Sequence, residues 1–420
     1  MEDKNKQYLV SMTIMGALFF IFGFVTWVNG PLITFVKLAF DLDTDSKAFL
    51  VTFVFYLAYF FLALPSSWIL EKTGMKKGMA VGLITMAIGA FMFGHFTTAR
   101  NYTMSLIGLF VIGSGMSLLQ TAVNPYVSII GPIESAAKRI SIMGICNKVA
   151  GMLAPLIFGA LVLKDVDQFE SSVKSAPDEA TREQLLNSFA SSVYTPYLIM
   201  AVFLLAFAIW ITRSALPEIR TSDVNKAPEG SASNRTSIFQ FPYLLLGALC
   251  IFLYVGAEVM AGDAIGTYGK GFNIPTDETK YFTTYTLIGM AIGYIAGLAM
   301  IPRYMSQSQA LKISAILGII FTIAAVLTHG YVSVVFVAAL GLANALMWPS
   351  IWPLAIEGLG KFTEKGAALL IMGIAGGAII PKVYAGLKDD YDFQWTFFAL
   401  TLPCYVYILF FAQKGHKIGR

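Results

Sequence analysis

The sequence predicts an all-α membrane protein whose twelve transmembrane helices form two six-helix bundles. First, 57% of the 420 residues are hydrophobic, 13% are charged and the mean hydropathy is +0.69. A soluble domain carries roughly 25% charged residues, so much of this surface must face lipid. Second, the chain holds apolar windows of about 20 residues, the length of a helix that crosses a bilayer. Third, one polar segment divides these windows into six and six.

Each half of the chain contributes six apolar windows, spaced mostly by short loops. In the first half they are Leu9–Leu32, Phe49–Leu70, Gly78–Phe96, Thr103–Ile129, Ile140–Leu163 and Val193–Leu216. In the second half they are Phe241–Tyr268, Phe282–Ile301, Ala310–His329, Val332–Ile356, Ala367–Leu387 and Gln394–Gln413. The one long loop, Leu163–Ser192, carries mixed charges and is expected to be a surface loop or a short helix.

The polar segment between the two sets predicts the domain boundaries. Residues 217–237 read PEIRTSDVNKAPEGSASNRTS, a composition that can neither span a membrane nor build a core. We therefore expect an N-terminal bundle at residues 1–216, a cytoplasmic linker at 217–238 and a C-terminal bundle at 239–420. The start of the chain, MEDKNKQ before a long apolar run, lacks a small-residue cleavage site, so the first helix is expected to stay in the mature protein.

The distribution of lysine and arginine predicts the orientation in the membrane. The chain ends and the even-numbered loops hold 18 of the 29 basic residues, whereas the odd-numbered loops hold ten and most of the acidic residues. Cytoplasmic loops are the ones enriched in lysine and arginine. Both termini are therefore expected to be cytoplasmic.

Several function classes are disfavoured by what the sequence lacks. A net charge of +4 is too small and too dispersed for a nucleic-acid binder. The cysteines and histidines are few and far apart, which offers no disulfide framework, zinc site or catalytic triad: Cys146, Cys250, Cys404, His95, His329 and His416. No nucleotide-binding glycine motif occurs, and no set of nucleophile, base and orienting residue is visible. We therefore expect neither an enzyme nor a cofactor, and any energy source is an ion gradient or the substrate gradient.

Three ionisable residues lie inside the predicted spans, where charges are costly and usually functional. Lys148 lies nine residues past Arg139, roughly 13 Å deep at 1.5 Å per residue, and Glu258 lies past the middle of its span. We expect the two to meet across a central cavity, either as an ion-coupling switch or as a static salt bridge. Asp263 lies about 140° around the helix from Glu258, so it has either a coupling role or a water-exposed helix-end role.

Amides and tryptophans form a second group at mid-span. Gln120 and Asn124 are four residues apart and share a helix face. Amides both donate to and accept from hydroxyls, and an indole can cover the apolar face of a sugar ring. We therefore expect a site for a neutral polyol, although these residues could instead join helices or anchor them at the interface. The candidate substrate-binding residues are Asn147, Gln120, Asn124, Asn29, Trp27, Asn344, Trp348 and Trp352.

Four segments carry a family resemblance that covers nearly the whole chain. They are EKTGMKKG at 71–78, LQTAVNPY at 119–126, GPIESAAKRISIMGICNK at 131–148 and GLANALMWPSIWPLAIEGLGKFT at 341–363. With these blocks the chain resembles the major facilitator superfamily, in particular the fucose:proton symporter family and its glucose/galactose or N-acetylglucosamine transporter branch. The resemblance implies the major facilitator fold, a central monosaccharide site and cation-coupled uptake across a bacterial inner membrane.

The resemblance also assigns roles to single positions. It makes Asn147 a sugar ligand. The fucose branch has a coupling glutamate where this chain has Gln120, and an Asn-Asp pair where this chain has Asn29 and Gly30. Since both acidic groups are absent here, any acidic function must have moved, and Glu258 is the main candidate. Lys148 is a further departure, which either replaces a cation or sets the proton affinity of Glu258.

Together these observations predict a secondary transporter that imports a neutral hexose or N-acetylhexosamine by alternating access, coupled to a proton gradient. Sodium coupling and uncoupled uniport stay open as alternatives. Two further alternatives are an exporter of drugs or lipids and a membrane receptor that binds sugar without transporting it. The expected partners are the sugar, a proton or sodium ion and the lipid bilayer, and we expect a monomer. The predicted ion-coupling residues are Glu258, Lys148 and Asp263.

Overall fold

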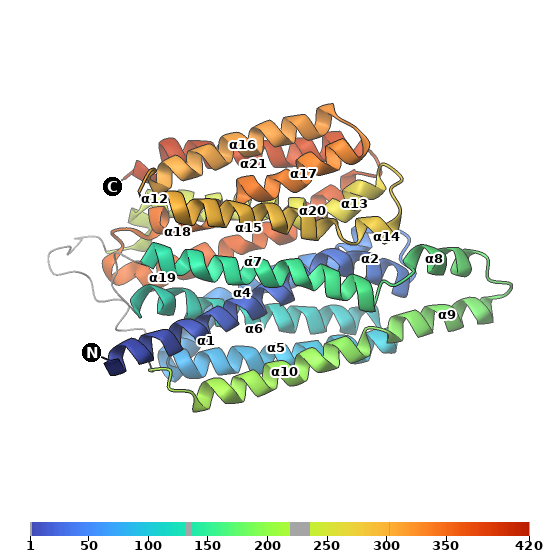
Figure 1. Cartoon of the computed structure of the whole chain (residues 1–420), viewed down its shortest axis with the longest axis horizontal. Coiled ribbons are helices and arrows are strands. Elements are labelled where there is room, and N and C mark those ends of the chain that lie inside the picture. The colour runs from blue at the N-terminus through green and yellow to red at the C-terminus, as the bar shows by residue number, and fades with distance from the viewer. Residues whose placement is uncertain (1, 131–135, 219–235, 302, 420) are drawn as a thin grey trace.

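The computed structural model describes residues 2–130, 136–218, 236–301 and 303–419, and these ranges contain helices but no strands. Helical segments in these ranges provide twelve membrane-spanning candidates by length and hydropathy, which agrees with the predicted number. Figure 1 shows the long helices running side by side, with both chain ends at the same end of the molecule. The predicted all-α membrane fold is confirmed.

The described part of the first half contains ten helices. They are α1 (Glu2–Trp27), α2 (Asn29–Ala39), α3 (Asp45–Ala48), α4 (Leu50–Thr73), α5 (Met75–Thr98), α6 (Tyr102–Ile129), α7 (Ala136–Leu161), α8 (Val166–Lys174), α9 (Glu179–Ser191) and α10 (Tyr194–Arg213). The predicted surface segment at 163–192 thus forms the two helices α8 and α9. Asp178 caps α9 by accepting a 2.7 Å hydrogen bond from the Thr181 N–H, and this bond lowers the pKa of the Asp178 carboxyl.

The second half is interrupted more often. Its described elements are η2 (Ile238–Gln240), α12 (Pro242–Gly262), α13 (Ile265–Lys270), α14 (Thr276–Thr279), α15 (Phe282–Met300), α16 (Gln307–Leu327), α17 (Gly330–Asn344), α18 (Met347–Ile356), η3 (Gly360–Phe362), α19 (Thr363–Met372), η4 (Gly373–Ala375), α20 (Gly376–Leu387), α21 (Phe393–Gln413) and η5 (Gly415–Lys417). The tenth span combines α17 and α18, and the eleventh combines α19, η4 and α20.

Two predicted spans end or break at other residues than expected. The first span breaks at Val28, between α1 and α2, and not at Gly30–Pro31. Pro31 lies in the first turn of α2, where its missing N–H needs no partner within the helix. The seventh span ends at Gly262, short of the predicted Tyr268, which belongs to the separate helix α13.

The helices of each half pack mainly among themselves. In the first half α5 packs on α6 and α10, and α1 packs on α7; in the second half α16 packs on α17 and α21, and α12 packs on α20 and α21. The two halves meet where α7 packs on α15 and where α4 packs on α19 and α20. Most of the predicted linker, residues 219–235, lies outside the described residues, so the domain boundaries stay a prediction.

A glycine allows α1 to approach α7 at the level of the central cavity. A Cβ added to Gly23 would lie 1.8 Å from the carbonyl oxygen of Asn147, which is backbone and cannot move aside. Small residues permit such close helix contacts in membranes. The position of Asn147 therefore depends on the absence of a side chain at residue 23.

Gly23→Ala is expected to destabilise the protein by about 1–3 kcal/mol, because the added methyl group must push α1 away from α7. Thermal unfolding of the purified protein in detergent measures this. Gly386→Ala in α20 is the matched control, since a Cβ there would meet no atom within 4 Å apart from its chain neighbours and the backbone of its own helix. Equal unfolding temperatures for the two variants would contradict the importance of the close contact.

Candidate functional site

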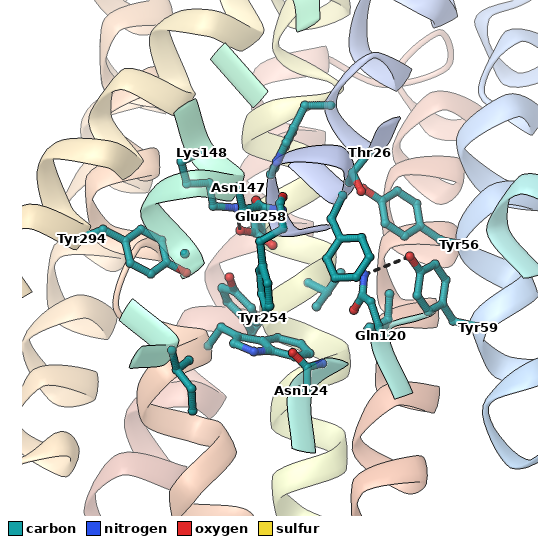
Figure 2. A pocket seen from close by; sticks show the side chains of 18 residues that line it. Thr26, Tyr56, Tyr59, Gln120, Asn124, Asn147, Lys148, Tyr254, Glu258 and Tyr294 are labelled. Carbon is teal, nitrogen blue, oxygen red and sulfur yellow. Dashed lines mark hydrogen bonds and ion pairs between the residues drawn. The ribbon is translucent and has the colours of Figure 1, made fainter. Parts of the chain in front are cut away.

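A cavity of about 120 Å³ lies between the two halves. It is lined by Phe19, Phe22, Thr26, Trp27, Tyr56, Tyr59, Gln120, Asn124, Ile140, Gly144, Asn147, Lys148, Tyr254, Val255, Glu258, Tyr294, Trp348 and Ile374. Figure 2 shows the polar members of this lining converging from both halves. Ile140 and Gly144 belong to the first turns of α7, so the cavity extends toward the end of the molecule that holds both termini.

The two opposite charges predicted to meet do so at this cavity. The Nζ atom of Lys148 on α7 lies 3.1 Å from Oε1 of Glu258 on α12, and the residues are 6% and 9% exposed. Lys148 also lies 4.6 Å from the centroid of the Trp27 ring, a cation–π contact. Removing one partner of a buried ion pair leaves an uncompensated charge, which costs several kcal/mol. The predicted contact is confirmed, and its role in ion coupling stays a prediction.

Three of the predicted amides line the cavity. The side chain of Gln120 donates a 3.1 Å hydrogen bond from Nε2 to the Tyr59 hydroxyl, and Figure 2 shows this bond beside Asn124. Asn147 donates from Nδ2 to the Phe19 carbonyl at 3.3 Å, so it also joins α7 to α1. A carboxamide has two N–H donors and one carbonyl oxygen. A single donated bond therefore uses only part of the hydrogen-bonding capacity of such a group.

Four residues of the lining do not stand out in the sequence: Tyr56, Tyr59, Tyr254 and Tyr294. Tyr254 lies one helical turn before Glu258 and interacts with its carboxylate. Tyrosines in apolar helices are usually core or interfacial residues, so their presence there does not by itself predict a site. The available signal was position, because Tyr254 and Glu258 are four residues apart and share a helix face. The tyrosines add hydroxyl groups to the amides and the charge pair of the lining.

Three predicted substrate-binding residues do not line the cavity, which corrects their expected placement. Asn344 is fully buried inside the second half, where its Oδ1 accepts a 3.0 Å hydrogen bond from Tyr405. Trp352 stacks against Trp348 with ring centroids 5.4 Å apart, and only Trp348 reaches the cavity. Asn29 is 1% exposed at the start of α2, beyond Trp27. Asn29 begins α2 and Asn344 ends α17, and at such helix breaks the direction of a side chain cannot be read from helical spacing in the sequence.

Asp263 is the third ionisable residue of the predicted group. It directly follows α12 and is 2% exposed, so the helix-end position is right and the water-exposed alternative is wrong. Asp263 is not part of the cavity lining. The first span covers it, because Gly30 and Trp27 pack against the end of α12.

At the end opposite the termini, two aspartates from different halves cap each other's helices. We call this pair the Asp167–Asp277 clasp. Asp167 in α8 accepts hydrogen bonds from the Thr276 and Asp277 N–H groups at 2.9 and 3.1 Å. Asp277 in α14 accepts from the Val166 and Asp167 N–H groups, both at 3.3 Å. Carboxylates are favourable at helix N-termini, so the clasp stabilises contact between the halves.

Lysines of the second half add further bonds to the first half at this end. Lys280 donates to the Leu163 carbonyl at 2.7 Å, and Lys382 donates to the Ser46 hydroxyl at 2.6 Å. Lys388 lies 2.6 Å from Asp45. Burial opposes the charge of Lys388, but Asp45 and Asp389 outweigh it and raise the pKa of this lysine. The cavity is therefore sealed by polar contacts on the side away from the termini.

The described residues hold no group of three histidine, cysteine or acidic residues that could bind a metal ion. What the cavity offers is a set of amides and hydroxyls between aromatic rings, with one charge pair. Such a lining suits a neutral molecule with several hydroxyl groups.

Comparisons with known proteins agree with this architecture. The model of the Major Facilitator Superfamily matches residues 15–381. The glucose/galactose transporter of Brucella abortus biovar 1 (strain 9-941) is 34% identical over 418 residues, which cover 99% of this chain and 96% of that one. The L-fucose-proton symporter of Escherichia coli (strain K12) is 26% identical over 416 residues, covering 98% and 94%.

A solved structure supports the same fold. The crystal structure of the transporter FucP in the outward conformation superposes with a TM-score of 0.78 at 24% identity, covering 97% of this chain and 99% of that one. These relatives are transporters and not enzymes. With twelve candidate spans and a family model that matches most of its length, this multi-pass membrane protein belongs to the major facilitator superfamily.

Proposed function

We propose that this protein imports a neutral monosaccharide, a hexose or an N-acetylhexosamine, by alternating access and with coupling to a proton gradient. The observation that carries the proposal is the lining of the central cavity, which combines amides, tyrosine hydroxyls and indole rings. The relatives named as glucose/galactose transporter and L-fucose-proton symporter support the substrate class and the coupling ion.

The binding residues are assigned by what each lining group can offer to a sugar. Asn147, Gln120 and Asn124 donate to and accept from ring hydroxyls. Trp27 and Trp348 lie on opposite halves and provide apolar faces for the ring. Because these groups belong to both halves, a bound sugar bridges them, which a carrier needs in order to couple binding to the movement of its halves.

Coupling is assigned to the Lys148–Glu258 pair. The pair joins the two halves at the cavity, so a proton on Glu258 removes the charge that holds Lys148 there. Weakening the pair changes the balance between the arrangements of the halves, which is how a bound proton can drive transport.

The proposed orientation of the protein in the membrane is based on the distribution of its basic residues. We place both termini in the cytoplasm and the protein, as a monomer, in a bacterial inner membrane. In this orientation the Asp167–Asp277 clasp lies outside, so the molecule is closed to the outside and its cavity extends toward the cytoplasm.

The proposed function is tested first by uptake into proteoliposomes. With an inward proton gradient and no sodium, one sugar from a panel of labelled monosaccharides is expected to accumulate about tenfold per pH unit for one-to-one coupling. Accumulation only with sodium would replace the proton by a sodium ion. Equilibration without accumulation would indicate a uniporter, and binding without movement across the bilayer would indicate a receptor.

The coupling pair is tested by Glu258→Gln and Lys148→Ala. Glu258→Gln is expected to abolish uphill accumulation while sugar exchange across the membrane continues, because exchange does not need the proton step. Lys148→Ala is expected to reduce transport at least tenfold. Val149→Ala, at the same depth but without a charge, is the matched control. Unchanged accumulation in Glu258→Gln would refute the assignment, and equally small effects of the two alanine variants would reduce Lys148 to a structural role.

The clasp is tested by a reversible crosslink between the halves. In a protein whose native cysteines are replaced by alanine, Asp167→Cys with Thr276→Cys is expected to stop transport when oxidised and to restore it when reduced. Thr97→Cys with Ser105→Cys is the control, since these hydroxyls lie 3.0 Å apart within the first half at the same end. Full transport by the oxidised Asp167/Thr276 pair would show that the halves do not separate there.

A further inference from the structure

Asp263 is a buried carboxyl group whose two oxygens have no hydrogen-bond partner among the residues that the structure describes. Both Oδ1 and Oδ2 are shielded from solvent, and the whole residue is 2% exposed. A carboxylate in such a place loses its hydration and gains nothing in return, so the neutral acid is the form that fits. This contrasts with Glu258, five residues earlier in α12, whose carboxylate is paired with Lys148.

The surroundings of Asp263 reinforce this conclusion. Asp263 directly follows the C-terminal end of α12, where the helix dipole is negative and disfavours a second negative charge. Two threonine hydroxyls at this end of α12 are committed elsewhere: Thr283 donates to the Gly262 carbonyl at 2.8 Å, and Thr286 donates to the Ala261 carbonyl at 2.7 Å. A threonine hydroxyl has one hydrogen to donate, so neither can also donate to Asp263.

Asp263 interacts with two titratable groups, Glu258 on α12 and Tyr56 on α4. Tyr56 interacts electrostatically with both carboxyl groups, and Glu258 interacts with Asp263. Tyr56 and Glu258 line the cavity, whereas Asp263 does not. Thr283 of α15 and Trp27 and Gly30 of the first span also pack at this end of α12, and none of them carries a titratable group. Asp263 thus lies behind the cavity, on its sealed side, next to two groups that reach the cavity.

The first half of the chain covers Asp263. A Cβ added to Gly30 would lie 3.4 Å from the Asp263 Cα, and a Cβ added to Gly262 would lie 2.2 Å from the Trp27 ring. Both covering residues belong to the first span, whereas Asp263 belongs to the second half. The cover is therefore removed when the halves separate at this end, and it closes when the Asp167–Asp277 clasp forms.

We propose that Asp263 binds the coupled proton: it takes up the proton when the end opposite the termini is open and holds it as a neutral acid once the first span has closed over it. The proton then passes toward Glu258 and the cavity. Asp263 is thereby the residue that binds the proton first, and protonation of Glu258 then weakens its ion pair with Lys148. The proposal rests on proton-coupled sugar transport, and its test separates the two.

Infrared spectroscopy tests the protonation directly and without any substrate. The wild-type protein in detergent at neutral pH is expected to show the carbonyl band of a protonated carboxylic acid. Asp263→Asn should lose this band, whereas Glu258→Gln and the exposed Asp390→Asn should keep it. Because asparagine resembles the neutral acid in shape, Asp263→Asn is also expected to unfold at the wild-type temperature. A band that survives in Asp263→Asn, or a variant that does not fold, would overturn the proposal.

Transport tests the coupling role. In proteoliposomes, Asp263→Asn is expected to exchange sugar at the wild-type rate but to lose all proton-driven accumulation, while Asp390→Asn keeps it. Accumulation by Asp263→Asn would overturn the assignment of Asp263 and leave proton symport intact. A wild-type protein that accumulates no sugar on a proton gradient would instead overturn the proposed function, and the role of Asp263 in it as well.

Discussion

The ion pair between Lys148 and Glu258 is the interaction on which the arrangement of the two halves depends. Each charge is buried at a depth where a lone ion is costly, and each is supplied by a different half of the chain. Neither half can keep its charge in this environment without the other half in contact. The pair therefore ties the electrostatics of the cavity to the positions of the two bundles, and any event that changes one charge changes the stability of that contact.

The rest of the cavity is arranged around this pair. Trp27 of the first half packs beside Lys148 and also against the end of α12. Its ring therefore contacts both the lysine of the ion pair and the second half of the chain. Gly23 lets α1 approach α7 closely enough for Asn147 to bond to the Phe19 carbonyl. The absence of a side chain at Gly23 thus helps to place one of the polar groups of the cavity.

Polar contacts close the molecule on one side, and they differ in kind from those of the cavity. The clasp uses backbone N–H groups at helix ends, with Asp167 and Asp277 as acceptors from opposite halves. Such contacts lie at the ends of helices, where water could replace each of them if the halves separated. A closure of this type is reversible, whereas a closure made of packed apolar side chains would resist opening.

The sequence by itself determined the all-α membrane fold, the six-and-six arrangement and the depth of Lys148 and Glu258, because apolar length and the cost of buried charge are local properties that can be read along the chain. The amides Gln120, Asn124 and Asn147 could also be identified, because a polar side chain inside an apolar span is visible in the sequence. Tertiary structure alone decided that Asn344 and Trp352 point elsewhere, that tyrosines complete the lining, and that Asp263 is covered by the first span. Those outcomes depend on where helices break and on which side chains of the two halves meet. Contacts between residues far apart in the chain produce no periodic pattern in the sequence, so they cannot be predicted from it.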